Sequence, residues 1–109
     1  MVHPVPPTGE PKMMFLETPP KLIPTDIFSA MPADFRRKVA SEWADANRPG
    51  AVTDCFIEGP SFDAEGNLYI VDIPFGRIFR IAPDRTWSQV AEYDGWPNGL
   101  KIDASGRIL

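Results

Sequence analysis

The sequence lacks most of the residues from which nucleophilic and zinc sites within one chain are built. Its 109 residues include one cysteine, Cys55, and one histidine, His3. A single cysteine can form neither an intrachain disulfide nor a thiolate zinc cluster. Because the histidine lies in a proline-rich terminus with nothing to hold it in place, we expect no Ser-His-Asp or Cys-His mechanism within this chain. We interpret Cys55, which precedes Phe56 and Ile57, as a small buried hydrophobe.

Long apolar runs and clustered positive charge are also missing. No run approaches the roughly 18 apolar residues that span a bilayer, and the N-terminus has neither the basic start nor the apolar stretch of a secretory signal. The formal net charge is −4, whereas a nucleic-acid or anionic-membrane surface would need a clustered basic face. We therefore expect a cytoplasmic protein with no nucleic-acid and no membrane partner.

Proline is abundant and concentrated near the N-terminus, where seven of the thirteen prolines lie within residues 1–24. Each proline removes a backbone donor and restricts the residue before it. Residues 1–31 are therefore predicted to be an extended or disordered lead-in. Residues 32–50 are predicted to form a short helix and a linker. The helix, over residues 32–46, would carry Phe35, Val39 and Trp43 in one apolar stripe that docks on a sheet.

The remaining segment, residues 51–109, contains a repeat. Laying Gly59 on Gly99 aligns four identical pairs and two apolar pairs: Gly59/Gly99, Asp63/Asp103, Ala64/Ala104, Gly66/Gly106, Phe62/Ile102 and Leu68/Ile108. A period of about 40 residues with strand-like segments inside it indicates a stacked or radially repeated β architecture.

Four short antiparallel strands are predicted within the first repeat. They cover residues 53–62 with a corner at residues 58–60, then residues 68–73, 77–81 and 87–93. Such a unit is typical of one blade of a β-propeller. The predicted fold class is therefore all-β: the first one-and-a-half blades of a propeller, preceded by the proline-rich tail and one short helix. Because Leu109 falls within a strand of the second repeat, we expect the sequence to be the N-terminal part of a longer protein.

Glu58 and Asn98 occupy equivalent positions in the two repeats, each directly before a glycine. Equivalent positions of successive blades converge on the axis of a propeller, and carboxylate and amide oxygens are hard ligands for calcium or magnesium. The alternative is that Glu58 caps a turn and Asn98 adopts a turn conformation in Pro-Asn-Gly. The repeated Asp63 and Asp103 are interpreted as turn residues that bond their own backbone.

Three further charged residues have no predicted catalytic role. Asp72 follows an apolar strand and is read either as a strand-end turn residue or as part of a pocket rim. Arg77 and Arg80 are interpreted as solvated or edge-protecting.

A set of short motifs extends the repeat to a family resemblance. Residues 54–109 resemble the family of gluconolactonase, senescence marker protein (regucalcin) and luciferin-regenerating enzyme. The motifs that carry the resemblance are Glu58-Gly59-Pro60, Gly66-Asn67-Leu68-Tyr69 with Asp72-Ile73, Gly76-Arg77-Ile78-Phe79-Arg80, and Asn98-Gly99-Leu100 with Asp103 and Gly106-Arg107.

The resemblance implies a six-bladed propeller with one divalent cation in its central channel, calcium first, with magnesium or zinc as alternatives. It also implies a hydrolase that opens sugar lactones or related cyclic esters. Glu58 matches the family's first metal-binding glutamate, and Asn98 matches an asparagine that lines the substrate pocket. The family's other ligand and its catalytic aspartate belong to later blades, so the catalytic residues are not identifiable in this sequence.

Two other hypotheses remain beside the lactonase. One is a propeller without enzymatic activity, used as a binding scaffold, because this fold hosts many functions. The other is self-association, in which the open sheet edge at residues 107–109 pairs with another chain.

Overall fold

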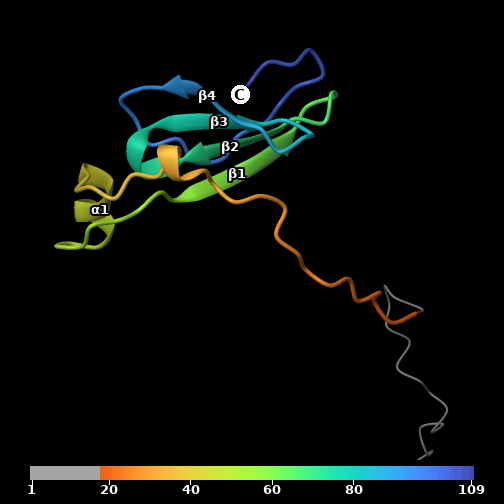
Figure 1. Cartoon of the computed structure of the whole chain (residues 1–109), viewed down its shortest axis with the longest axis horizontal. Coiled ribbons are helices and arrows are strands. Elements are labelled where there is room, and N and C mark those ends of the chain that lie inside the picture. The colour runs from red at the N-terminus through yellow and green to blue at the C-terminus, as the bar shows by residue number, and fades with distance from the viewer. Residues whose placement is uncertain (1–17) are drawn as a thin grey trace, which may run out of the picture.

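The computed structural model describes residues 18–109, and its centre is one four-stranded antiparallel sheet (Figure 1). The strands are β1 (Ile57–Phe62), β2 (Leu68–Asp72), β3 (Arg77–Ile81) and β4 (Trp87–Glu92), and they are ordered β1-β2-β3-β4. The fold is therefore mostly β, as predicted. Three strands match their predicted ranges to within a residue, whereas the first begins at Ile57 rather than at residue 53. Residues 1–17, part of the predicted lead-in, lie outside the described residues.

Alternation along the strands gives the sheet two apolar faces. On the first face, Ile70, Phe79 and Ile81 form a buried cluster, with Leu68 and Trp87 beside it. On the second face, Val71 and Ile73 are buried together with Leu100, with Tyr69, Ile78 and Ile102 packed around them. Leu100 and Ile102 belong to the second repeat, so that repeat covers the second face.

The lead-in covers the first face. Residues 19–32 form neither helix nor strand; their first part lies away from the sheet and their last part contacts it (Figure 1). The indole N–H of Trp87 donates a hydrogen bond to Ser29 Oγ at 2.9 Å, and Met31 packs against the first cluster. Phe28 meets Phe62 edge-on with ring centroids 6.1 Å apart. The extended conformation was predicted for these residues, but their packing was not.

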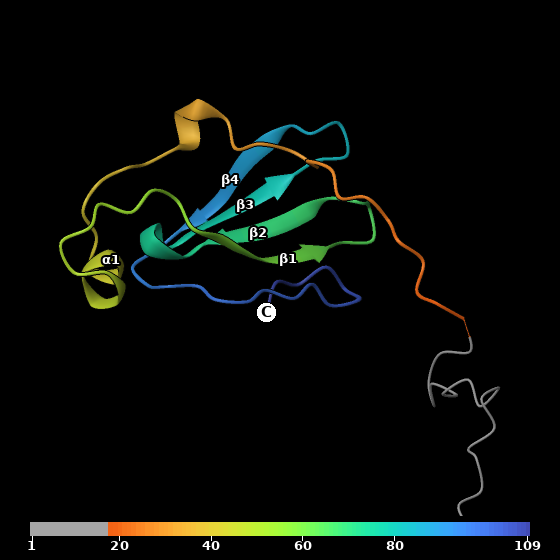
Figure 2. The same ribbon diagram turned by 90° about the horizontal axis from the view of Figure 1, so that it is seen from below.

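The single helix predicted over residues 32–46 is wrong. The chain instead forms a 3-10 turn, η1 (Ala33–Phe35), and a separate helix, α1 (Glu42–Asn47), which Figure 2 shows apart from each other. Phe35 packs on the first cluster and Trp43 on the second. One straight helix cannot bring a single stripe to both faces of a sheet, so the intervening residues are extended. The helix α1 is capped at its N-terminus by Ser41, whose Oγ accepts the Ala44 N–H at 3.1 Å.

The two repeats fold into the same hairpin turn. Asp63 N–H donates to the Asn67 carbonyl at 3.0 Å, and Asp103 N–H donates to the Arg107 carbonyl at 3.0 Å. In each turn the aspartate Oδ1 accepts two backbone N–H groups, at 2.9 Å in all four bonds. Hydrogen bonds from the Ser105 hydroxyl and from Arg107 lower the pKa of Asp103 to about 2. The interpretation of Asp63 and Asp103 as turn residues is confirmed.

Within residues 18–109, no helix is long and apolar enough to cross a membrane.

Candidate functional site

The structure brings the backbone segments of Glu58 and Asn98 together at one edge of the sheet. Glu58 lies in β1 opposite Val71, and the register shifts between Glu58 and Ser61, where Gly59 has a φ of 63°. A Cβ built on Gly59 would lie 3.0 Å from the Cα of Gly99 and 3.0 Å from the N of Leu100. The glycines of the two repeats are therefore in close contact. Farther along, Ile102 N–H donates to Ser61 Oγ at 3.3 Å.

Both side chains at this contact are exposed. Among the hydrogen bonds and ion pairs formed within residues 18–109, none involves the carboxylate of Glu58 or the amide of Asn98. No three Asp, Glu, His or Cys side chains in the described part of the chain lie close enough together to hold a metal. At this edge, two residues with side-chain oxygens therefore lie on adjacent backbone segments, and neither side chain forms a hydrogen bond or an ion pair with another described residue.

The contact between the glycines leads to a matched pair of substitutions. Gly59→Ala is expected to destabilise the fold by about 1–3 kcal/mol more than Gly99→Ala, because the new methyl meets backbone that cannot move aside. Gly99 also has a positive φ, 79°, but no atom of residues 18–109 lies within 4 Å of its missing Cβ. Urea unfolding of the two variants measures the difference. Equal losses of unfolding free energy would mean that the backbone of the second repeat is not packed against Gly59 of β1.

A buried ion pair fixes the chain just before Glu58. Arg77 donates to Asp72 Oδ2 from Nε at 3.0 Å and from Nη2 at 2.6 Å, and the two residues are 1% and 0% exposed. Asp72 Oδ1 accepts the Phe56 N–H at 2.9 Å, while the Phe56 carbonyl accepts the Ile73 N–H at 3.1 Å. The interpretation of Arg77 as solvated or edge-protecting is therefore wrong. Asp72 is a buried structural residue that holds the start of β1.

Arg77 is buried because three different segments surround its guanidinium group. Besides Asp72, its Nη2 donates to Cys55 Sγ at 3.2 Å, and the group lies 4.8 Å from the ring centroid of Phe79. Charge, sulfur and the aromatic face together replace the water that an arginine would otherwise need. Arg80, in contrast, is exposed as predicted.

Cys55 is half-buried between residues 35–37 and the sheet. Its Sγ accepts the Arg37 N–H at 3.3 Å, and its thiol lies 3.8 Å from the carbonyl oxygens of Phe35 and Arg37. Burial raises the pKa of the Cys55 thiol, so the thiol stays protonated at neutral pH and is a poor nucleophile. Cys55 was interpreted as a small buried hydrophobe, but it is half-buried and its sulfur joins segments as a hydrogen-bond acceptor for Arg37 and Arg77.

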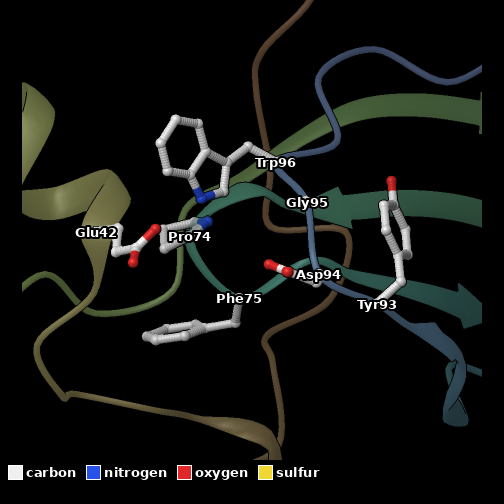
Figure 3. Close-up of a pocket in the computed structure, with 7 residues that line it drawn as sticks. All are labelled: Glu42, Pro74, Phe75, Tyr93, Asp94, Gly95 and Trp96. Atoms are coloured by element: carbon white, nitrogen blue, oxygen red, sulfur yellow. The ribbon is translucent and has the colours of Figure 1, made fainter.

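A pocket that was not predicted from the sequence lies at the end of the sheet where β2 ends and β3 begins (Figure 3). It has a volume of about 190 Å³ and lies between α1, the 3-10 turn η2 (Ile73–Phe75) and the loop after β4. Two acidic residues, Glu42 and Asp94, and three aromatic residues, Phe75, Tyr93 and Trp96, line it. The only sequence signal was the run Tyr93-Asp94-Gly95-Trp96, which mixes acidic and aromatic side chains.

In comparisons with known proteins, no family model, no curated protein and no solved structure matched the chain. The resemblance noted from the motifs therefore stays a prediction, and the functional assignment depends on the geometry of the described residues.

Proposed function

We propose that residues 51–109 are the first blade and the beginning of the second blade of a β-propeller, and that the protein hydrolyses lactones at a divalent cation. The observation that carries the proposal is the contact between equivalent glycines of the two repeats, which makes Glu58 and Asn98 neighbours in space. Successive blades of a propeller meet in this way along their innermost strands.

The covering of the sheet supports the blade assignment. A propeller blade is apolar on both faces because it packs between two others, whereas an isolated antiparallel sheet commonly has one solvated face. Here the second face is covered by Leu100 and Ile102 of the next repeat. The first face is covered by Met31, the last residue of the lead-in, and by Phe35 of η1, which occupy the place of a preceding blade.

The roles of the two site residues follow from their chemistry. Glu58 would contribute a carboxylate oxygen, a donor that suits calcium or magnesium. One donor is too few for either ion, so the proposal requires further ligands from other repeats. A bound divalent cation would act as a Lewis acid on the lactone carbonyl. In this chain, Glu58 would hold the cation, and Asn98 would orient the substrate by hydrogen bonding.

Substitution of the proposed ligand tests the function. In the protein that carries this chain, Glu58→Gln is expected to reduce calcium-dependent hydrolysis of an aldonolactone by about 100-fold or more, because an amide binds the cation more weakly than a carboxylate. Hydrolysis is followed by the acid released, with and without a chelator. Because Glu58 is exposed, its substitution is expected to change the free energy of unfolding by less than about 0.5 kcal/mol.

Glu65→Gln is the matched control, since Glu65 is an exposed glutamate in the hairpin turn, away from the glycine contact. Its activity is expected to equal that of the unmodified protein. If chelation and Glu58→Gln both leave lactone hydrolysis unchanged, the cation mechanism is wrong. If no lactone is hydrolysed under any condition, the propeller is better explained as a binding scaffold.

A further inference from the structure

We infer that the pocket between α1, η2 and the loop after β4 binds a small organic cation, such as a quaternary or alkyl ammonium group. This inference does not depend on lactone hydrolysis, because none of the pocket residues belongs to the Glu58–Asn98 edge. The volume of about 190 Å³ is below the range of drug-sized ligand sites, roughly 300–1,000 Å³. It suits a head group rather than a whole cofactor.

The charged residues that line the pocket are both acidic. Glu42 and Asp94 contribute carboxylates from elements far apart in the sequence, and no lysine or arginine of residues 18–109 lines the pocket. Figure 3 shows both carboxylates turned toward Pro74, one on either side of it. Each ion pair found within residues 18–109 joins other residues, so neither carboxylate is neutralised by the described part of the chain. A ligand between them would therefore be positively charged.

The aromatic residues distinguish an organic cation from a metal ion. Trp96 is 52% exposed, and Figure 3 shows its indole beside Pro74 and Glu42, where a ligand can reach it, whereas the ring of Tyr93 is turned away from both carboxylates. Phe75 is already engaged, with the guanidinium groups of Arg37 and Arg77 5.7 and 5.6 Å from its ring centroid. A calcium or magnesium ion takes six or more oxygen ligands, whereas two carboxylates line this pocket. An ammonium group instead gains from a tryptophan or tyrosine face beside a carboxylate, which is the usual chemistry of quaternary ammonium recognition.

Choline is a suitable probe, because its neutral isostere 3,3-dimethylbutanol has the same shape without the charge. The probe is titrated into the 109-residue chain at constant ionic strength, and the indole N–H resonance of Trp96 is followed by NMR. That resonance is assigned by its loss in Trp96→Phe. Choline and tetramethylammonium are expected to shift it saturably with millimolar dissociation constants, while the isostere leaves it unchanged.

Four variants locate the site. Trp96→Ala, followed through the backbone amide of Gly95, is expected to weaken choline binding about tenfold, and Glu42→Gln and Asp94→Asn several-fold each. The charge-matched control Glu65→Gln is expected to bind normally. Equal shifts with the isostere would show an apolar patch only, and competition by millimolar calcium would show a metal site; either result overturns the proposal. Absence of a saturable shift in the folded chain overturns it as well.

Discussion

Asp72→Asn is expected to lower the free energy of unfolding by about 3–5 kcal/mol, because it leaves the Arg77 guanidinium buried without a counter-charge. The side-chain oxygen of the introduced amide can still accept the Phe56 N–H that Asp72 binds at 2.9 Å. The loss therefore reports the missing charge rather than a missing hydrogen bond to β1. Urea unfolding followed by tryptophan fluorescence measures it.

A second substitution separates the charge effect from a packing effect. Arg77→Met removes the guanidinium but keeps an unbranched side chain against Phe79 and Phe75. The double variant, Asp72→Asn with Arg77→Met, is expected to be more stable than Asp72→Asn alone, since a buried pair can often be replaced by apolar groups at little cost. If the double variant instead loses the sum of the two single losses, the residues do not act as a pair.

Glu92→Gln is the matched control at an exposed ion pair. Glu92 pairs with Arg37 at 2.7 Å, and the side chains of Glu92 and Arg37 are 41% and 39% exposed. Pairs of this kind contribute about 0–1 kcal/mol. A loss in Asp72→Asn no larger than in Glu92→Gln would contradict the view that the buried pair holds the sheet to the segment before β1.

The sequence predicted the features that are encoded locally. Alternation along β2, β3 and β4 determines which residues face each side of a sheet, so the strand ranges could be read from residue order. The turns were predictable because an aspartate and a glycine at fixed spacing satisfy the backbone by themselves. The contact between Gly59 and Gly99 was predictable for a different reason, since equivalent positions of successive repeats are expected to lie close together.

The features that were missed all depend on contacts between distant segments. Phe35 and Trp43 have helical spacing, yet they pack on opposite faces of the sheet, and this divides the expected helix. Arg77 looked solvated in a strand whose neighbours alternate, because nothing nearby shows that Cys55 and Asp72 will enclose it. The pocket joins Glu42 to the loop after β4, and no local pattern connects these two segments.

The second large effect is expected at Gly76, where two sides of the pocket meet. Gly76 ends η2 in the left-handed conformation, with a φ of 60°, and its carbonyl accepts the Tyr93 N–H at 3.0 Å. A Cβ added there would overlap the Tyr93 carbonyl oxygen and lie 2.8 Å from that of Gly95. Gly76→Ala is therefore expected to cost about 2–5 kcal/mol, the sum of left-handed strain and steric overlap.

Gly50→Ala separates these two causes. Gly50 also has a positive φ, 79°, but no atom lies within 4 Å of its missing Cβ, so its substitution is expected to cost only about 1–2 kcal/mol of strain. The additional loss of unfolding free energy in Gly76→Ala, relative to Gly50→Ala, measures how rigidly the loop after β4 packs against η2. Because that loop carries Tyr93, Asp94 and Trp96, Gly76→Ala should also weaken choline binding in whatever fraction of the protein stays folded, whereas Gly50→Ala should not. Equal losses of stability would instead mean that the loop can move away from η2. The residues of the loop would then not be held in place around the pocket.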